Sequence, residues 1–248
     1  MKVTKIIVLL TTMCMLCGLV ACGDDADTKV DDGQVTIDEK EVSDPSDAKE
    51  KTGTYDEITE EVVRNHAVTD ASDFEYEKNE YTGEITITDY IGKDAVVVFP
   101  EEIDGCPVIG SYNFFFANDE YPHVKGVFFP ESVKELNNVF GNNSTIEVVI
   151  AEGVEVLGTG PFLNCAKLHT LILGENLKEI SALTAIGGVP SLKEVYLPPT
   201  LETIAEGTFS LAKEEGGWFG EDFTVKGKSG SYIETYCTEN DIKFEAVE

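Results

Sequence analysis

The residue types that usually carry catalysis or bind metals are sparse in this sequence, and their spacing suits neither role. His66, His123 and His169 lie far apart, and none belongs to the His-Glu-x-x-His pattern that binds zinc. Cys14 and Cys17 form a Cys-x-x-Cys pair, which is typical of redox proteins, but both lie in an apolar N-terminal run. We therefore predict no catalytic residue, no metal site, no cofactor and no enzymatic activity.

Two glycine-containing segments share part of the pattern of nucleotide-binding loops. Residues 227–229 read Gly-Lys-Ser, as at the end of a phosphate loop, but Asp222 stands where that loop needs its first glycine. Gly158 and Gly160 begin like a dinucleotide-binding turn, but Leu163 stands at the third glycine position. Both patterns are incomplete, so we expect these glycines to have structural roles.

Composition narrows the classes of partner. The chain has 248 residues, with 47 Asp and Glu against 18 Lys and Arg, which gives a formal net charge of −29. Binding to nucleic acid or to anionic lipid headgroups needs a positive surface, so we expect neither kind of partner. Hydrophobic residues make up 42% of the chain, which is enough for a folded core.

The N-terminus has the pattern of a secretion signal. Lys2 and Lys5 precede an uncharged apolar run at 6–20, which is shorter than the roughly 20 residues of a membrane-spanning helix. The run ends in Leu-Val-Ala-Cys, which resembles the bacterial lipobox. The resemblance implies that residues 1–21 are a signal peptide and that Cys22 becomes a lipid-modified N-terminus attached to the bacterial cell membrane.

An acidic segment follows the signal. Residues 23–54 contain no aromatic side chain and are rich in Asp and Glu, so they cannot bury enough apolar surface to offset their chain entropy. We predict a disordered tether over 22–72, with a short helix near 55–66, where three aliphatic residues have helical spacing. The folded domain is then expected over 73–248.

A repeat of about 21–30 residues organises that domain. Each copy has an apolar residue, a turn, and two aliphatic residues three apart, and a further aliphatic lies two residues before each copy. A coil of this kind buries little alone, but stacked coils bury a continuous core, so the pattern predicts a solenoid with one short parallel strand per coil. The copies are Phe99–Ile103, Phe129–Leu136, Ile150–Leu157, Leu173–Ile180 and Leu197–Ile204, and the preceding aliphatics are Val97, Val127, Val148, Leu171 and Val195.

Three segments also carry a family resemblance. They are Phe-Leu-Asn-Cys-Ala-Lys-Leu at 162–168, the stretch 90–108, and the stretch 225–236. They resemble the BspA-type leucine-rich repeats of bacterial surface proteins. The resemblance implies a leucine-rich-repeat solenoid with turns or short helices between strands and a helix-strand cap at 224–248. It also implies adhesion or another interaction with a host at the cell surface.

One column of side chains is predicted to face away from the core. Alternation along a strand points the residue before each repeat onto the outer face of the sheet. An apolar stripe there, with polar flanks, is a candidate surface for a protein or glycan partner. The stripe could instead be covered by the insert at 114–123, or could simply favour strand formation. Its members are Val98, Phe128, Val149, Ile172 and Tyr196, and its flanking residues are Glu147, His169 and Glu194.

Equivalent acidic residues recur in successive coils. Stacking would place their carboxylates about 4.8 Å apart, one strand spacing, where they could bind Ca²⁺ or a basic partner or form a solvated edge. They are Glu101, Glu131, Glu152 and Glu175. Cys106 lies in an expected turn and is a candidate exposed thiol, whereas Cys165 and Cys237 occupy expected inward positions.

Two other functions stay open at this stage. The chain could be a structural or assembly protein that binds a partner of the same cell, or a hydrolase whose site leaves no recognisable motif. The first would use the apolar stripe as a permanent interface, and the second would need a Glu–His pair that only the fold brings together.

Overall fold

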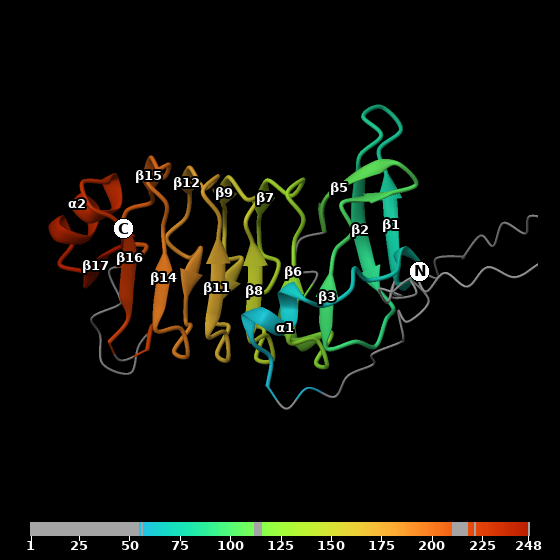
Figure 1. The fold of residues 1–248 in the computed structure, drawn as a ribbon, viewed down its shortest axis with the longest axis horizontal. Helices are drawn as coiled ribbons and strands as arrows, with labels where there is room; N and C mark the ends of the chain where they lie inside the picture. Colours follow the sequence, from blue (N-terminus) through green and yellow to red (C-terminus); the bar gives the residue numbers. More distant parts are fainter. Residues whose placement is uncertain (1–54, 56, 112–115, 210–217, 221, 248) are drawn as a thin grey trace, which may run out of the picture. The chain divides into compact units, whose positions relative to one another are not determined.

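The strands of the repeat stack side by side in a computed structural model of the chain (Figure 1). The structure describes residues 55, 57–111, 116–209, 218–220 and 222–247. The expected signal peptide 1–21, Cys22 and the tether up to residue 54 lie outside the described residues. No helix within the described ranges has the length and apolar character needed to cross a membrane.

Parallel strands form two ladders along the solenoid. The first has the order β11-β8-β6-β3 and the second has the order β15-β12-β9-β7. The first ladder consists of β3 (Val96–Val98), β6 (Gly126–Phe128), β8 (Val148–Ala151) and β11 (Thr170–Leu173), and the second of β7 (Glu135–Leu136), β9 (Val156–Leu157), β12 (Glu179–Ile180) and β15 (Thr203–Ile204). A shorter parallel pair joins β10 (Phe162–Leu163) to β13 (Ile186–Gly187).

Separate elements close the two ends of the stack. A four-stranded sheet lies at the N-terminal end, in the order β1-β2-β5-β4, and a three-stranded sheet lies at the C-terminal end, in the order β14-β16-β17. The first sheet consists of β1 (Phe74–Lys78), β2 (Ile85–Tyr90), β4 (Glu102–Ile103) and β5 (Cys106–Ser111), and the second of β14 (Glu194–Tyr196), β16 (Thr224–Lys228) and β17 (Phe244–Val247). The helical segments are α1 (Glu60–Arg64), α2 (Tyr232–Glu239) and the 3₁₀ turns η1 (Ala71–Asp73) and η2 (Ala117–Asp119).

The predicted leucine-rich-repeat solenoid is confirmed by the way equivalent residues share one core. Val133, Val154, Leu177 and Leu201 come from successive copies of the repeat, and all four are buried in the same cluster. Rings also stack from coil to coil, since the centroids of Phe140 and Phe162 are 5.8 Å apart at an interplanar angle of 14°. The expected cap is present as β16, α2 and β17, which follow one another over the last coil.

The turns of neighbouring coils approach closely. A Cβ atom added at Gly153 would lie 2.6 Å from the Cα of Glu131 in the preceding coil. That separation is too short for any side chain, so glycine allows the backbones of the two turns to come together.

One coil departs from the expected register. Phe128 pairs with Ile150, an offset of 22 residues, whereas Leu136 pairs with Leu157, an offset of 21. The coil that contains β8 therefore has one residue fewer between β8 and β9 than the preceding coil has between β6 and β7. The prediction that Val149 faces outward was wrong: Val149 lies in the main core, and Val148 and Ile150 face outward. A one-residue shift exchanges the two faces of a strand.

The segment around α1 covers part of the outer strand face. Ile58 and Val63 are fully buried there, in a second cluster with Val98, Val148 and Ile150. A Cβ atom at Gly126 of β6 would lie 2.6 Å from Cγ2 of Val63, so the absence of a side chain lets α1 sit directly on the sheet. The segment around α1 therefore covers this half of the stripe, a role for which the insert at 114–123 was one of the alternatives.

The folded domain consequently begins before residue 73. Thr69 is buried, its hydroxyl accepts a hydrogen bond from the backbone of Val98, and its own N–H donates to the carbonyl of Val98. The described residues from Ile58 onward are thus part of the folded domain, not of a tether. α1 itself lies inside the range 55–66 where a helix is expected.

A guanidinium group fastens α1 to the solenoid. Arg64 donates to both carboxylate oxygens of Glu152, at 3.0 and 2.8 Å, and to Glu60 within α1 at 2.7 Å. These hydrogen bonds raise the pKa of Arg64, and the same contact from Arg64 lowers the pKa of Glu152. The bidentate geometry gives the pair a defined orientation although both side chains are partly exposed.

The shared core makes the middle coil sensitive to loss of volume. We expect Leu177→Ala to lower the free energy of unfolding by about 2–5 kcal/mol, because it removes a fully buried side chain and leaves a cavity. Leu183→Ala is the matched control: Leu183 is 50% exposed, and its truncation should change stability by less than about 0.5 kcal/mol. Urea unfolding of the full chain measures both, and equal effects would contradict a common core.

The contact between Arg64 and Glu152 should make α1 docking depend on pH. A lowered carboxyl pKa stabilises the docked state above the ordinary glutamate value of about 4.3, and the effect is lost as the pH falls through the folded pKa. We expect hydrogen-exchange protection factors at Val63 and Asn65 to drop between about pH 5 and pH 3. In Glu152→Gln, protection should be lower near neutrality and should vary less over that range. An unchanged pH profile in this variant would show that the pair does not hold α1.

Candidate functional site

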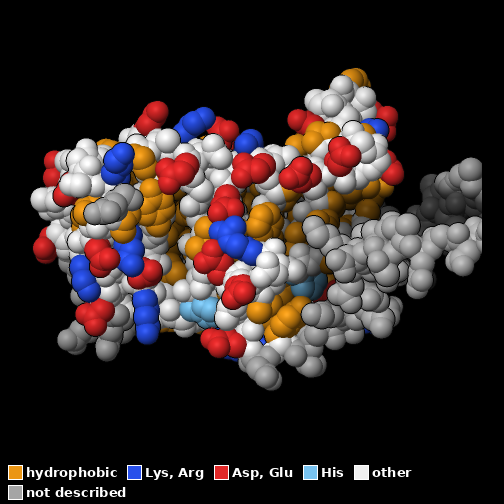
Figure 2. Space-filling model, viewed as in Figure 1, with side chains coloured by type: hydrophobic (Ala, Val, Ile, Leu, Met, Phe, Trp, Pro, Cys, Tyr) orange, Lys and Arg blue, Asp and Glu red, His pale blue; other side chains and the backbone are white. Residues whose placement is uncertain are grey.

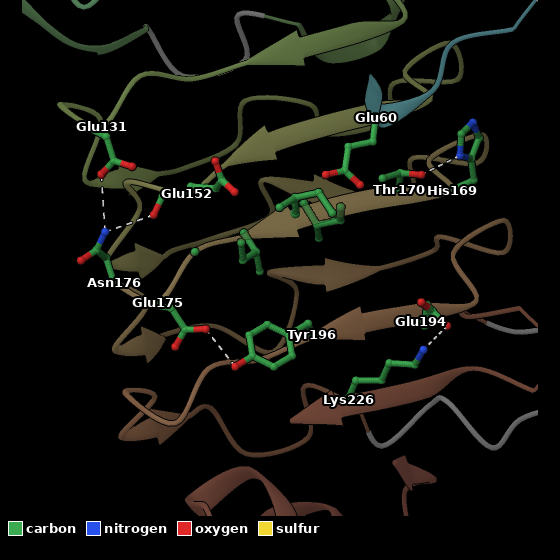
Figure 3. Close-up of a pocket in the computed structure, with 14 residues that line it drawn as sticks. Glu60, Glu131, Glu152, His169, Thr170, Glu175, Asn176, Glu194, Tyr196 and Lys226 are labelled. Atoms are coloured by element: carbon green, nitrogen blue, oxygen red, sulfur yellow. Dashed lines mark hydrogen bonds and ion pairs between the residues drawn. The ribbon is translucent and has the colours of Figure 1, made fainter. Parts of the chain in front are cut away.

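A groove of about 700 Å³ opens on the outer strand face beside α1. Strands β11 and β14 and Lys226 of β16 contribute to it, and Glu60 extends into it from α1 (Figure 3). Figure 2, in the same view as Figure 1, shows acidic side chains gathered on this face with hydrophobic side chains visible between them. The groove therefore lies where the cover provided by α1 ends.

The groove coincides with an interruption of the strand ladder. β11 and β14 are neighbours in space, but β11 ends the first sheet and β14 begins the last one. Leu171, Leu173 and Gly174 line the groove although the side chains of both leucines point into the core. Main-chain atoms of this stretch therefore form part of the groove surface.

Two apolar side chains form the outward-facing floor. Ile172 and Tyr196 are both half-buried, and Ile172 also packs at the edge of the cluster under α1. The hydroxyl of Tyr196 donates to Glu175 at 2.9 Å. Desolvation, followed by this hydrogen bond, raises the pKa of Tyr196 above its ordinary value.

Carboxylates gather at the turn end of the groove. Glu131, Glu152 and Glu175 come from three successive coils, but the expected stacking is shifted by one residue, because Gly153 stacks on Glu131 and Gly174 stacks on Glu152. Glu152 is paired with Arg64, whereas Glu131 accepts from the side-chain amide of Asn176 at 3.5 Å (Figure 3). The row thus continues along the groove. The fourth expected member, Glu101, is exposed and is not among the lining residues.

The other end of the groove mixes charges of both signs. Lys226 pairs with Glu194 at 2.8 Å and with Glu245 at 3.7 Å, and Glu194 is the first cause of its raised pKa. His169 is exposed, and its Nδ1 lies 3.0 Å from the hydroxyl of Thr170 (Figure 3). This end can therefore make polar contacts with a ligand that reaches beyond the apolar floor.

The structure brings together four of the eight predicted site residues. Ile172, Tyr196, His169 and Glu194 all line the groove. The other four do not: Val98 lies buried under α1, Phe128 packs at the edge of that cluster, Val149 is in the core, and Glu147 pairs with Lys125 at 3.4 Å. The predicted stripe is thus divided into a covered half and an open half.

Sequence reasoning missed the residues that reach the groove from outside the repeat. Glu60 lines it from α1 and Lys226 lines it from the cap, and Arg64 of α1 is not a lining residue but pairs with Glu152, which is. Arg64 lies 88 residues from its partner Glu152, so no local spacing could have linked them. The only available signal was the aliphatic pattern near 55–66, which shows that this segment has an apolar face to bury.

The motifs considered for catalysis have structural roles. A Cβ atom at Gly227 would lie 2.7 Å from Cγ2 of Ile233, so this glycine lets β16 pack against α2. Cys165 is buried, and its thiol donates to the carbonyl of Phe140 at 3.2 Å. Among the residues that the structure describes, no cluster of three or more His, Cys, Asp or Glu side chains could hold a metal ion.

Comparison with known proteins identifies the repeat. Residues 98–214 match the model of the BspA type leucine rich repeat region, with six copies. Comparison with curated proteins finds no match. A crystal structure of the leucine rich repeat protein of T. pallidum has a TM-score of 0.54 at 24% identity, and the alignment covers 64% of this chain and 71% of that one. At this identity the similarity supports the fold alone.

A second crystal structure, of a leucine-rich repeat protein from Bacteroides ovatus, has a TM-score of 0.47 at 20% identity. That alignment covers 65% of this chain and 40% of the other. The family match lies on the coils that carry the groove, and it agrees with the stacked strands described above. The coils within residues 98–214 are therefore similar to the BspA type leucine rich repeat region, which confirms the predicted resemblance.

Proposed function

We propose that this chain is a lipid-anchored bacterial surface protein whose repeat domain binds a protein or glycan partner without catalysis. The observation that carries the proposal is the open half of the outer strand face. There an apolar floor of Ile172 and Tyr196 is surrounded by polar groups that converge on a groove of about 700 Å³. Concave apolar sites with a few placed polar groups are typical of ligand recognition.

The family points in the same direction. BspA-type repeats suggest a protein-interaction role, and a leucine-rich-repeat solenoid is usually a binding scaffold. The apolar floor and the family together favour recognition by the groove.

The surface location rests on the N-terminal sequence. Lys2 and Lys5, the apolar run at 6–20 and the sequence ending in Cys22 have the order of a lipoprotein signal. Residues 23–54 would then separate the folded domain from the membrane, and their acidic side chains would favour an extended chain. In this arrangement the groove faces partners outside the cell, which supports an adhesive or host-directed role.

Substitution of the groove floor tests the binding role. In a screen of the full chain against host matrix components and whole cells of its own species, we expect Ile172→Ser combined with Tyr196→Ser to abolish a hit. The double variant removes both outward apolar side chains, and loss of an interface centre of this kind weakens binding by about tenfold or more. Binding to host components alone would favour adhesion, and binding to cells of the same species alone would favour an assembly role.

Leu183→Ser is the matched control for that experiment. It removes an apolar side chain that is exposed and lies outside the groove, so it should leave binding unchanged. If the control weakens binding as strongly as the double variant, or if the double variant binds normally, the groove is not the site.

The lipid anchor is tested separately at Cys22. We expect the native chain, expressed in a bacterium that processes lipoproteins, to incorporate a labelled fatty acid and to fractionate with the membrane. Cys22→Ser removes the thiol that would be acylated, so label and membrane association should both be lost. Ala26→Ser serves as a control outside the lipobox. Incorporation of label into Cys22→Ser would rule out this anchor.

A further inference from the structure

We propose that the partner engages the groove through a short basic peptide segment, in which aliphatic side chains adjoin an arginine or lysine. The proposal rests on the function proposed above and specifies its ligand. It is argued from a segment already docked on the same face of the sheet, and from the charge of the part that is still open.

The segment around α1 shows what chemistry this face accepts. Its contacts include two buried aliphatic side chains, Ile58 and Val63, with Tyr55 and Val62 packed beside them, and one guanidinium group. The guanidinium of Arg64 donates to the acidic row at Glu152 in a bidentate pair. An apolar contact on outward strand residues, next to a cation on the carboxylate row, is therefore a combination that this surface binds within its own chain.

The open half repeats both features one coil further along. Ile172 pairs in register with Ile150, which lies under α1, so it presents the same outward position in the next strand. Glu175 lies in the turn after β11, one position further along than Glu152 after β8, because Gly174 stacks on Glu152. The site used by α1 thus has a neighbour that also combines an outward isoleucine with a nearby carboxylate, and Tyr196 extends its apolar floor.

The charges of this neighbouring site differ in one respect. Glu152 receives its hydrogen bonds from a guanidinium, but Glu175 and Glu131 accept from neutral groups, the hydroxyl of Tyr196 and the amide of Asn176. The groove is lined by five glutamates and one lysine, and that lysine is paired with Glu194. A cation on the ligand would complement the turn end, whereas an anionic ligand would be repelled.

The main chain beside the gap between β11 and β14 favours a basic peptide over a small cation as the ligand. Leu171, Leu173 and Gly174 line the groove beside the apolar floor, and because both leucine side chains point into the core, we infer that their main chain faces the groove. Peptide amides can form hydrogen bonds with such groups while their side chains occupy the floor and the acidic row. A small cation alone would leave Ile172 and Tyr196 without a function.

The proposal is tested with synthetic peptides and the full chain. The first probe is the labelled peptide ITKKVVRN, which keeps the aliphatic residues and arginine of residues 58–65 but has lysine in place of both glutamates. Two control peptides separate the contributions: ITEEVVRN keeps the native charge, and SNKKSSRN keeps the cations without the aliphatic residues. We expect ITKKVVRN to bind most tightly, with an affinity that decreases as NaCl is added.

Variants then locate the peptide in the groove. We expect Glu131→Gln combined with Glu175→Gln to weaken ITKKVVRN by about tenfold, because the charged acceptors of the turn end are lost. Glu101→Gln combined with Glu102→Gln removes two exposed carboxylates elsewhere on the chain and should have little effect. Circular dichroism and melting temperature check that both double variants are folded.

Two outcomes would overturn the proposal, and they are distinguishable from failure of the proposed function. The proposal fails if ITKKVVRN binds no better than SNKKSSRN, or if the groove variants bind it as tightly as the native chain does. If a neutral glycan instead binds and is lost in Ile172→Ser with Tyr196→Ser, the groove remains the site but the basic-peptide assignment is wrong. If no ligand found in the screen depends on those two residues, the proposed function itself fails.

Discussion

The fold depends on the burial of aliphatic side chains that no single coil can shield from water. Each turn of the solenoid supplies only a few inward residues, and the next turn covers them. Leu177 illustrates the constraint, since it is fully buried although it lies in a short turn between two-residue and four-residue strands. Because every coil needs neighbours on both sides, the ends of the stack need separate elements, and the sheet containing β1 and the cap containing α2 provide them.

The same constraint explains why the outer strand face is divided. Strands that turn one face to the core turn the other face outward, and here the outward face carries four apolar side chains in register. They are Val98, Phe128, Ile150 and Ile172. A continuous apolar strip of this kind is unfavourable in water, and the segment around α1 buries its N-terminal half. The cover ends at β8, so the groove begins at β11. The candidate site is thus the uncovered remainder of a surface that the chain partly buries itself.

Carboxylates distinguish that remainder. Glu131, Glu152 and Glu175 from three successive coils line it, and Arg64 binds Glu152 at 2.8 Å. The contact also explains why α1 docks as a short helix of only five residues, which would be marginal alone. Its aliphatic contacts and its bidentate ion pair come from the solenoid, so its stability is tertiary.

The sequence by itself determined the solenoid, the order of its parts and, outside β8, the inward columns, because a repeated apolar pattern has few other ways to be buried. It also placed Ile172, Tyr196, His169 and Glu194 on one surface, since period-two alternation holds along each short strand. Only the tertiary structure decided the rest. The one-residue shift that turns Ile150 outward depends on how β8 pairs with β6 while β9 pairs with β7. The docking of α1 joins residues 88 positions apart through an interface that no local spacing encodes.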